Sequence, residues 1–409
     1  MLKGIIKKIV VLFGASLLGI VLGFLVSIFN SRVLGPEDFG NFKFIETVAR
    51  FIASIVSVGI FISLTRILAI NKDKTTEKKY IGLFTCVFGI TSLIGILLFV
   101  LFSFVEPHFF ESNLGAQFRT YFFIVASIIG YTAILEILKG LHKINTIALV
   151  NVLPVFGYLA VAYLLNKHTP ITLEITILLT YGILLFVILV VLIWLKPDFK
   201  IKKIQIAKLL YENKFNGRPI YYGSLAGVAT THIAGLSISY FMDNTQVGFF
   251  MLALTICTPL LVIPSVIGTI FFKQFVSMEA IPKKVYGFSI ASTIFALIVF
   301  YSLIEYVVVT FYTEAYLPVA DISKYIIIGF IFHGFGDLLN RFLGAKGKGK
   351  WLRNAAFLVG IVNVIGYTIF IKYFNINGAI LTKILASGLY LGLMVHYYRT
   401  YKKKQHFNG

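Results

Sequence analysis

Stretches of about 20 apolar residues, long enough as helices to cross a hydrocarbon core about 30 Å thick, recur along the whole chain. Short polar segments separate them. Backbone groups in lipid must satisfy one another, which leaves helices or a closed barrel. The stretches are apolar all round and do not alternate as barrel strands do, so they predict transmembrane helices. We place twelve spans, at about residues 9–32, 40–65, 80–105, 118–139, 145–165, 173–195, 219–241, 246–271, 285–311, 321–343, 352–372 and 377–398.

Composition agrees with an all-α membrane protein. Of the 409 residues, 58% are hydrophobic and 13% are charged, with a mean hydropathy of +0.89. Soluble proteins carry about a quarter charged residues. The two cysteines, Cys86 and Cys257, both lie in apolar spans, so we expect neither an external disulfide nor a metal site. The chain has no P-loop, zinc-ligand spacing or nucleophile elbow, so we expect no cofactor and no enzyme activity.

The basic residues set the predicted topology. The formal net charge is +20, which on a soluble protein would suggest nucleic acid. Here the lysines and arginines gather in alternate gaps between spans, with 29 in one set of gaps and 5 in the other. Cytoplasmic loops carry such an excess. We therefore expect both termini in the cytoplasm and no nucleic-acid partner.

The longest predicted cytoplasmic connection, residues 196–218, lies midway along the chain. Within it Ile201, Ile204, Ala207 and Leu210 fall on one helical face, with lysines elsewhere. This pattern is typical of a basic amphipathic helix lying on anionic headgroups. We interpret the segment as a linker between two six-helix lobes, residues 1–195 and 219–409.

The two lobes repeat part of their sequence. An offset of 208 residues places Ser31, Gly40 and Phe42 on identical residues, and an offset of 209 does the same for Lys139, Gly140, Asn145, Gly157 and Tyr158. Chance matching among Gly- and Phe-rich helices is the alternative. A duplication predicts two lobes with one orientation around a central cavity, related by an axis along the membrane normal.

Two motifs carry a family resemblance: Arg32-Val-Leu-Gly-Pro-Glu-Asp-Phe-Gly-Asn-Phe42 between the first two spans, and Asn375-Ile-Asn-Gly-Ala379 leading into the last. With the six-plus-six layout, they resemble the polysaccharide-export branch of the multidrug/oligosaccharidyl-lipid/polysaccharide (MOP) flippase superfamily. The resemblance implies a flippase of the bacterial inner membrane. Its expected substrate is an undecaprenyl-diphosphate-linked oligosaccharide, such as an O-antigen or capsule repeat unit. Its expected partners are membrane lipids and other glycan-assembly membrane proteins.

Two other functions stay open. A cation-coupled multidrug or metabolite antiporter of the same superfamily would need a buried carboxylate, and residues 9–29 contain none. Only Glu46 or Asp337 could then couple transport to a cation. A membrane glycan polymerase or glycosyltransferase would need catalytic residues on a substantial loop, and the predicted external loops are short.

Charged groups within spans are the candidate site, because each costs at least a few kcal/mol in lipid. Glu46 and Arg50 lie one turn apart near the middle of the second span, and can neutralise each other. They are either a structural ion pair or an anchored cation that receives a phosphate. The other predicted substrate-binding residues are polar groups within spans, for which buried structural contacts are the alternative: Lys383, His232, His333, Asn151 and Asn363.

Overall fold

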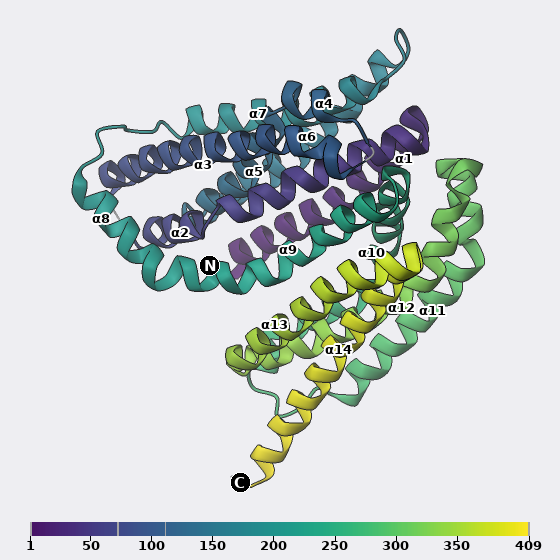
Figure 1. Ribbon diagram of the computed structural model, residues 1–409. Coiled ribbons are helices and arrows are strands. Elements are labelled where there is room, and N and C mark those ends of the chain that lie inside the picture. Colours follow the sequence, from purple (N-terminus) through teal and green to yellow (C-terminus); the bar gives the residue numbers. More distant parts are fainter. Residues whose placement is uncertain (1, 72, 111, 408–409) are drawn as a thin grey trace. The chain divides into compact units, whose positions relative to one another are not determined.

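The computed structural model describes residues 2–71, 73–110 and 112–407, without the side chains of residues 2–17, 20, 223–231, 273 and 404–407. The described chain is helical (Figure 1). It divides into two compact units, Met1–Leu225 and Ala226–Gly409. The predicted lobe boundaries, 195 and 219, stay a prediction.

The first unit is built around its most buried helix. Its helices are α1 (Leu2–Val56), α2 (Ile60–Ile70), α3 (Lys74–Phe109), α4 (Gly115–Thr120), α5 (Phe123–Gly140), α6 (Ile144–Leu165), α7 (Leu173–Trp194), α8 (Lys203–Glu212), a π-helical turn at Asn213–Gly217, and the first residues of α9 (Arg218–Phe241). Helix α5 packs against α1, α2, α3 and α7, and 67% of its 18 residues are buried. Small and branched apolar side chains allow that central position.

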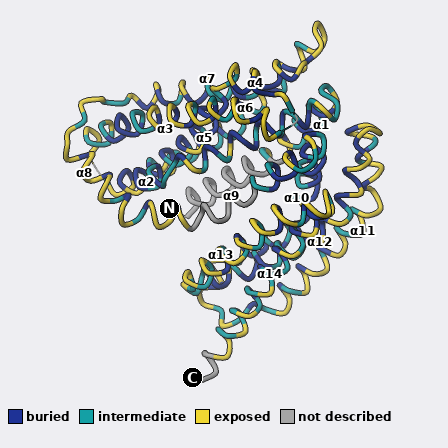
Figure 2. Tube along the Cα trace, in the orientation of Figure 1, coloured by how far each residue is buried: buried dark blue, intermediate teal, exposed yellow. Residues whose placement is uncertain are grey.

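The second unit continues α9 with α10 (Asn244–Phe275), α11 (Lys283–Val307), α12 (Leu317–Ala345), α13 (Gly349–Ile365) and α14 (Ile371–Phe407). Short π- or 3₁₀-helical turns lie at Val308–Tyr312, Glu314–Tyr316 and Gly366–Phe370. Helix α12 packs extensively against α10 and α14. Helix α11 is peripheral to its unit, because only 11% of the residues in its most apolar 18-residue stretch are buried (Figure 2).

Both family motifs lie at single-residue breaks inside long helices, where loops between spans were expected. In α1 the break is at Gly35, with φ 69° and ψ 175°, and Pro36 begins the next helical segment. Proline suits a first helical position because it has no N–H to leave unpaired. In α14 the break is at Asn375, with φ 53° and ψ −135°. The chain then passes so close to itself that a Cβ on Gly378 would lie 2.1 Å from the Phe370 carbonyl oxygen.

A further break, which the hydrophobic pattern did not predict, divides the expected second span. Val58 and Gly59 have φ values of 39° and 72°, and α2 departs from α1 at 59°. The predicted helix over 40–65 is thus two helices at an angle. Continuous hydrophobicity cannot reveal such a break, because both halves are equally apolar.

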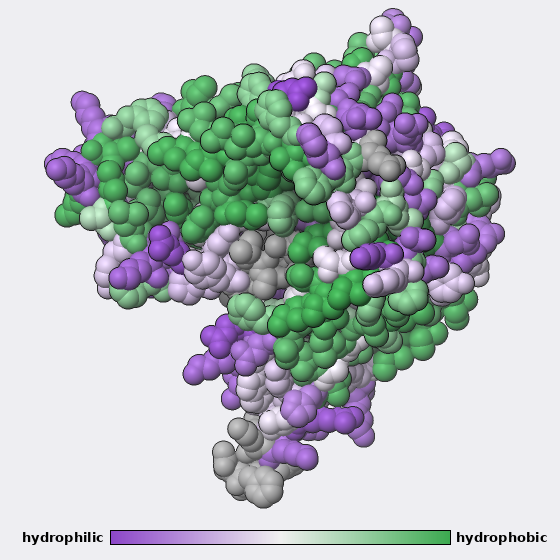
Figure 3. Space-filling view, in the orientation of Figure 1, coloured by the Kyte–Doolittle hydropathy of each residue, from purple (hydrophilic) through white to green (hydrophobic). Residues whose placement is uncertain are grey.

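The chain is a multi-pass membrane protein. Within the described residues, eight helices are long and apolar enough to cross a membrane, and the bent α1–α2 pair makes nine. Figure 3 shows hydrophobic side chains along the length of α3 and its neighbours, and hydrophilic ones toward the helix ends. The count of twelve spans and the side of the termini stay predictions.

Candidate functional site: a polar cavity in each unit

The first unit contains a cavity of about 250 Å³ between α1, α5, α6 and α7. Glu46 and Arg50 from α1 lie on its wall, with Tyr131 from α5, Asn151 from α6 and Tyr181 from α7. Arg50 is fifteen residues beyond the Gly35 break, about 22 Å along the helix at 1.5 Å per residue. The charged pair is therefore far from the break that begins its helical segment.

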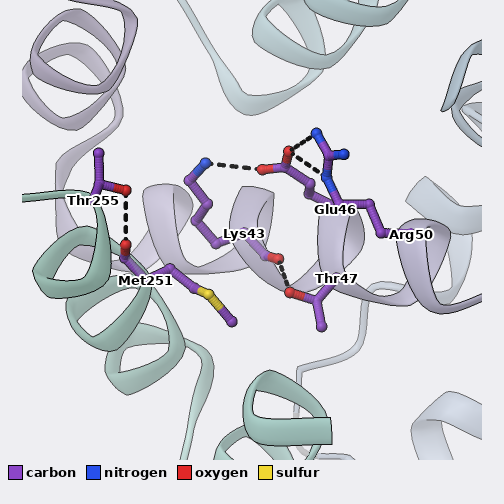
Figure 4. A network of polar contacts seen from close by, with 6 residues as sticks. All are labelled: Lys43, Glu46, Thr47, Arg50, Met251 and Thr255. Atoms are coloured by element: carbon purple, nitrogen blue, oxygen red, sulfur yellow. Dashed lines mark hydrogen bonds and ion pairs between the residues drawn. The ribbon is translucent and has the colours of Figure 1, made fainter. Parts of the chain in front are cut away.

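Glu46 is held by two cations from its own helix (Figure 4). Arg50 donates from Nε and Nη2 to Glu46 Oε1, at 2.9 and 2.8 Å. Lys43 donates from Nζ to Glu46 Oε2 at 2.8 Å. The spacings of three and four residues put all three side chains on one helical face. The expected Glu46–Arg50 pair is thus part of a triad, and Lys43 is the member that the sequence analysis missed.

The triad carries one positive charge in excess, because one carboxylate faces two cations. The bonds to Glu46 occupy two of the five guanidinium N–H donors of Arg50. Its side chain is 45% exposed, against 17% for Glu46. Glu46 thus orients the guanidinium while part of its donor fork is open to the cavity. A planar fork of this kind matches the oxygens of phosphate or carboxylate.

Uncharged polar groups complete the first cavity. Tyr131 Oη donates to Asn151 Oδ1 at 2.9 Å. Tyr158 is buried and donates to Asn30 of α1. The Oγ1 of Thr180, also on the wall, is buried without a hydrogen-bond partner among the described residues. The cavity therefore offers amide, phenol and hydroxyl groups besides its cation.

The second unit contains a cavity of about 380 Å³ between α9, α10, α12, α13 and α14. Its polar lining is His333 and Asn340 from α12, Asn363 from α13, and Lys383, Ser387 and Tyr390 from α14, with Tyr367. Several candidates from distant parts of the sequence, His333, Asn363 and Lys383, thus share one wall.

Tyr390 organises this second cavity. Its hydroxyl donates to Asp337 Oδ1 at 2.9 Å and accepts from Asn340 Nδ2 at 2.9 Å. The His333 ring stacks on the Tyr390 ring at 4.7 Å and 27°. A Cβ on Gly336 would lie 2.5 Å from the same ring, so only glycine leaves room for it. Asp337 therefore has a structural partner, which the sequence analysis did not foresee.

Lys383 supplies the charge of the second cavity. Its ammonium lies 4.8 Å from the centre of the Phe330 ring, a cation–π contact. None of the ion pairs found among the described residues includes Lys383. The last substrate candidate, His232, is half-buried on α9 and is not among the described residues that line this cavity.

The two cavities are lined at corresponding positions. The offset of 209 relates Tyr158 to Tyr367 and Tyr181 to Tyr390, and all four line a cavity. It relates Tyr131 to Asn340 and Pro154 to Asn363, again lining residues. The offset of 208 relates Glu46 to Leu254. These are the offsets found in the sequence repeat, and the agreement supports a duplication in which the charged groups diverged.

Solved structures share this fold. The lipid II flippase MurJ in an inward closed conformation matches 96% of this chain and 87% of its own, with a TM-score of 0.71 and 15% identity. A multidrug resistance MATE family transporter of the MOP superfamily, in an inward-facing conformation, matches 94% and 95%, with a TM-score of 0.64 and 14% identity. The outward-facing conformation of a MATE family transporter has a TM-score of 0.55 and 16% identity over 97% and 96%. At these identities the likeness establishes the fold.

The family follows from the sequence. A search of curated proteins finds no match. The model of the family described as "Polysaccharide biosynthesis protein" matches residues 5–273, which is more than half of the chain. This agrees with the structural likeness to the MOP-superfamily transporters and with the resemblance noted in the sequence. The chain belongs to the polysaccharide biosynthesis protein family.

Proposed function

We propose that this protein is a flippase that moves an undecaprenyl-diphosphate-linked oligosaccharide from the cytoplasmic to the outer leaflet of a bacterial inner membrane. The observation that carries the proposal is the excess positive charge of the Lys43–Glu46–Arg50 triad, of which Glu46 and Arg50 lie on a cavity wall. A diphosphate cannot cross hydrocarbon unaided, because transferring its charge out of water is strongly unfavourable. An oriented guanidinium with open donors is a suitable partner for it.

The second cavity suits the saccharide part of the head group. Its amides and hydroxyls can replace the water around sugar hydroxyls, and its aromatic rings can stack on sugar faces. The polyprenyl tail would stay in lipid throughout. We propose that both cavities become accessible from each side in turn, by alternating access as in other secondary transporters.

The antiporter alternative needs a carboxylate that is available to a coupling cation. Both oxygens of Glu46 accept bonds from cations of its own helix. Oδ1 of Asp337 accepts from Tyr390. These contacts favour the flippase, because each candidate carboxylate already has partners.

The deciding experiment measures translocation of a polyprenyl-diphosphate-linked oligosaccharide by the purified chain in vesicles. We expect movement between leaflets with the native protein. Arg50→Gln should slow it about a hundredfold, because losing about 3 kcal/mol of charge-assisted bonds corresponds to that factor. Arg50→Lys should fall between the two, since it keeps the charge without the fork. Arg353→Gln, which removes an exposed arginine, is the matched control.

A triple variant separates substrate binding from a structural ion pair. Changing Glu46 and Arg50 alone would leave Lys43 without its carboxylate, so Lys43→Gln, Glu46→Gln and Arg50→Gln are combined. This neutral triad should insert normally and stay inactive if Arg50 binds substrate. Normal insertion with restored translocation would refute the substrate role of Arg50. Hydrolysis or transfer of the glycan in place of movement would indicate the glycosyltransferase alternative.

A further inference from the structure

The segment between α7 and α9 is anchored to the first unit at both ends. At its beginning, Asp198 N donates to the Lys78 carbonyl at 3.0 Å, and a Cβ on Gly82 would lie 2.1 Å from the Asp198 carbonyl oxygen. At its end, a Cβ on Gly59 would lie 2.4 Å from the Gly217 carbonyl oxygen. Such backbone approaches require glycine. The segment is therefore fitted closely to α3 and to the break between α1 and α2.

The second anchor holds the broken end of the helix that carries Arg50. A helix that ends leaves its last carbonyls without partners in the chain. Tyr221 supplies one, donating to the Ile55 carbonyl at 2.8 Å. Beyond the break, Ser63 Oγ lies 3.2 Å from Asn213 Oδ1, and Arg66 pairs with Glu212 at 3.0 Å. Two side-chain contacts and one glycine contact from the segment, together with Tyr221 at the start of α9, thus hold both sides of the bend.

Helix α8, within this segment, turns an apolar face away from the protein. Its inner face holds Gln205 and Leu209, both buried, at a spacing of four residues. The opposite face presents Ile204 and Tyr211, 71% and 66% exposed, followed by Phe215, 54% exposed. Figure 2 shows this exposed stretch at the label α8. The exposed rings of Tyr211 and Phe215 lie 4.7 Å apart and extend one apolar surface.

Lysines border this apolar surface. At 100° per residue, Lys208 lies on one side of the Ile204–Tyr211 line, and Lys203 and Lys214 lie on the other. All three are exposed, and none takes part in an ion pair found among the described residues. Lys208 and Lys214 also make cation–π contacts, with Tyr80 and Phe215. An apolar stripe bordered by exposed lysines fits a surface that is apolar beneath and anionic above.

We propose that the outer face of α8 binds anionic phospholipid headgroups, and that this binding sets the geometry of the α1–α2 break and hence the activity at Arg50. Helix α8 packs on α3, where Lys208 Nζ lies 5.9 Å from the centre of the Tyr80 ring. Leu93 and Leu97, about 20 Å or more further along α3, are 68% and 59% exposed and would face lipid in a multi-pass protein. Helix α8 therefore lies at the end of a lipid-covered helix, where headgroups are expected. Arg50 lies nine residues before Gly59, about 13 Å along the helix, within reach of a rigid-body change at the break.

The binding test uses the full chain carrying Tyr211→Trp in vesicles. One set contains phosphatidylcholine alone, and the other also contains phosphatidylglycerol. We expect the added tryptophan emission to shift to the blue only with phosphatidylglycerol, and high salt to reverse the shift, because the attraction is screened. Each lysine near an anionic surface contributes about fivefold in affinity, so Lys203→Gln, Lys208→Gln and Lys214→Gln together should weaken the response on the order of a hundredfold.

The matched control changes three exposed lysines elsewhere: Lys350→Gln, Lys402→Gln and Lys403→Gln. Equal emission in both vesicles, or an equal loss in this control, would overturn the proposal. If the outer face of α8 were shielded in cells but the tryptophan emission did not respond in vesicles, the face would belong to a protein partner. That result would also overturn the proposal.

The coupling test uses Gly217→Ala. A Cβ there would lie 2.1 Å from Ser63 Oγ, so the anchor should loosen while the outer face of α8 is unchanged. We expect phosphatidylglycerol to raise translocation severalfold in the native protein and not in this variant, with the emission shift retained. Lipid dependence that survives Gly217→Ala would refute the coupling. Absence of translocation in every lipid would refute the proposed function instead, and the emission test would still decide the lipid site.

Discussion

The two cavities hold their charge in different ways. In the first, Arg50 comes from α1 and is oriented by Glu46 on the same helix, which Lys43 also contacts. In the second, Leu254 stands at the position that corresponds to Glu46, and the cation is Lys383 from α14. The tyrosines at the corresponding positions 158/367 and 181/390 line both cavities. The two cavities thus share tyrosines at corresponding positions, while the cation comes from a different helix in each.

The two cavities are expected to respond differently to a bound anion. A guanidinium held in place by its own carboxylate is preorganised, so little side-chain entropy is lost when an anion binds. Lys383 has a cation–π contact and no ion pair among those found in the described residues, so its ammonium is held less strictly. We therefore expect the first cavity to contribute the larger share of substrate recognition.

The largest effects are expected in the translocation assay, where Arg50→Gln is compared with Lys383→Gln. Arg50→Gln should slow translocation about a hundredfold and Lys383→Gln about tenfold, since a single ammonium makes fewer charge-assisted bonds than a guanidinium fork. Initial rates in vesicles, corrected for inserted protein, measure both. A larger effect at Lys383 would reverse the assignment of the principal anion site.

A second comparison concerns one glycine in each unit, Gly336 in the second and Gly157 in the first. Gly336→Ala should lower the free energy of unfolding by about 1–3 kcal/mol, because the added Cβ would overlap the Tyr390 ring at 2.5 Å. Gly157→Ala on α6 meets only an ordinary contact of 3.4 Å with Ile183 and should be close to neutral. Thermal unfolding in detergent measures both. Equal midpoints would contradict the tight Gly336–Tyr390 packing.

A third comparison removes one tyrosine hydroxyl from each cavity. Tyr390→Phe should lower the free energy of unfolding by about 2 kcal/mol, because it removes hydrogen bonds to both Asp337 and Asn340. Tyr131→Phe removes one bond, to Asn151, and should cost about 1 kcal/mol. Unfolding by denaturing detergent ranks the two. The reverse order would argue against Tyr390 as the organising residue of the second cavity.

The smallest expected effect concerns a helix start outside the membrane. Asp73 caps α3 by accepting from the backbone N–H of Thr75 and Thr76, and these bonds with the two threonine hydroxyls lower the pKa of its carboxyl. The contribution is present above the ordinary aspartate pKa of about 4 and is lost as pH falls through the lowered value. Asp73→Ala should therefore destabilise slightly at neutral pH, and Asp243→Ala at α10, whose carboxylate accepts one backbone bond, should do so less.

Several features of the candidate site could be predicted from the sequence because they are local. The four-residue spacing of Glu46 and Arg50 dictates that they meet on any helix. The hydrophobic pattern indicated membrane helices, and the basic segment near residue 200 indicated an amphipathic helix. Lys43 was equally accessible to the same reasoning, since it lies three residues before Glu46, but the sequence analysis did not consider it.

Other features depended on contacts between helices that no local pattern encodes. Tyr390 reaches Asp337 and Asn340 only because α12 and α14 pack closely at Gly336. The break at Val58–Gly59 is held by Gly217, more than 150 residues later.

The helical class, the family and the Glu46–Arg50 pair could be inferred from the sequence, because each rests on composition, motif or spacing along one helix. The packing of the helices was needed to learn which polar groups share a cavity, which carboxylates accept hydrogen bonds and where helices bend. Those outcomes depend on side chains that meet across helices, and apolar helices of similar composition can pack in many ways.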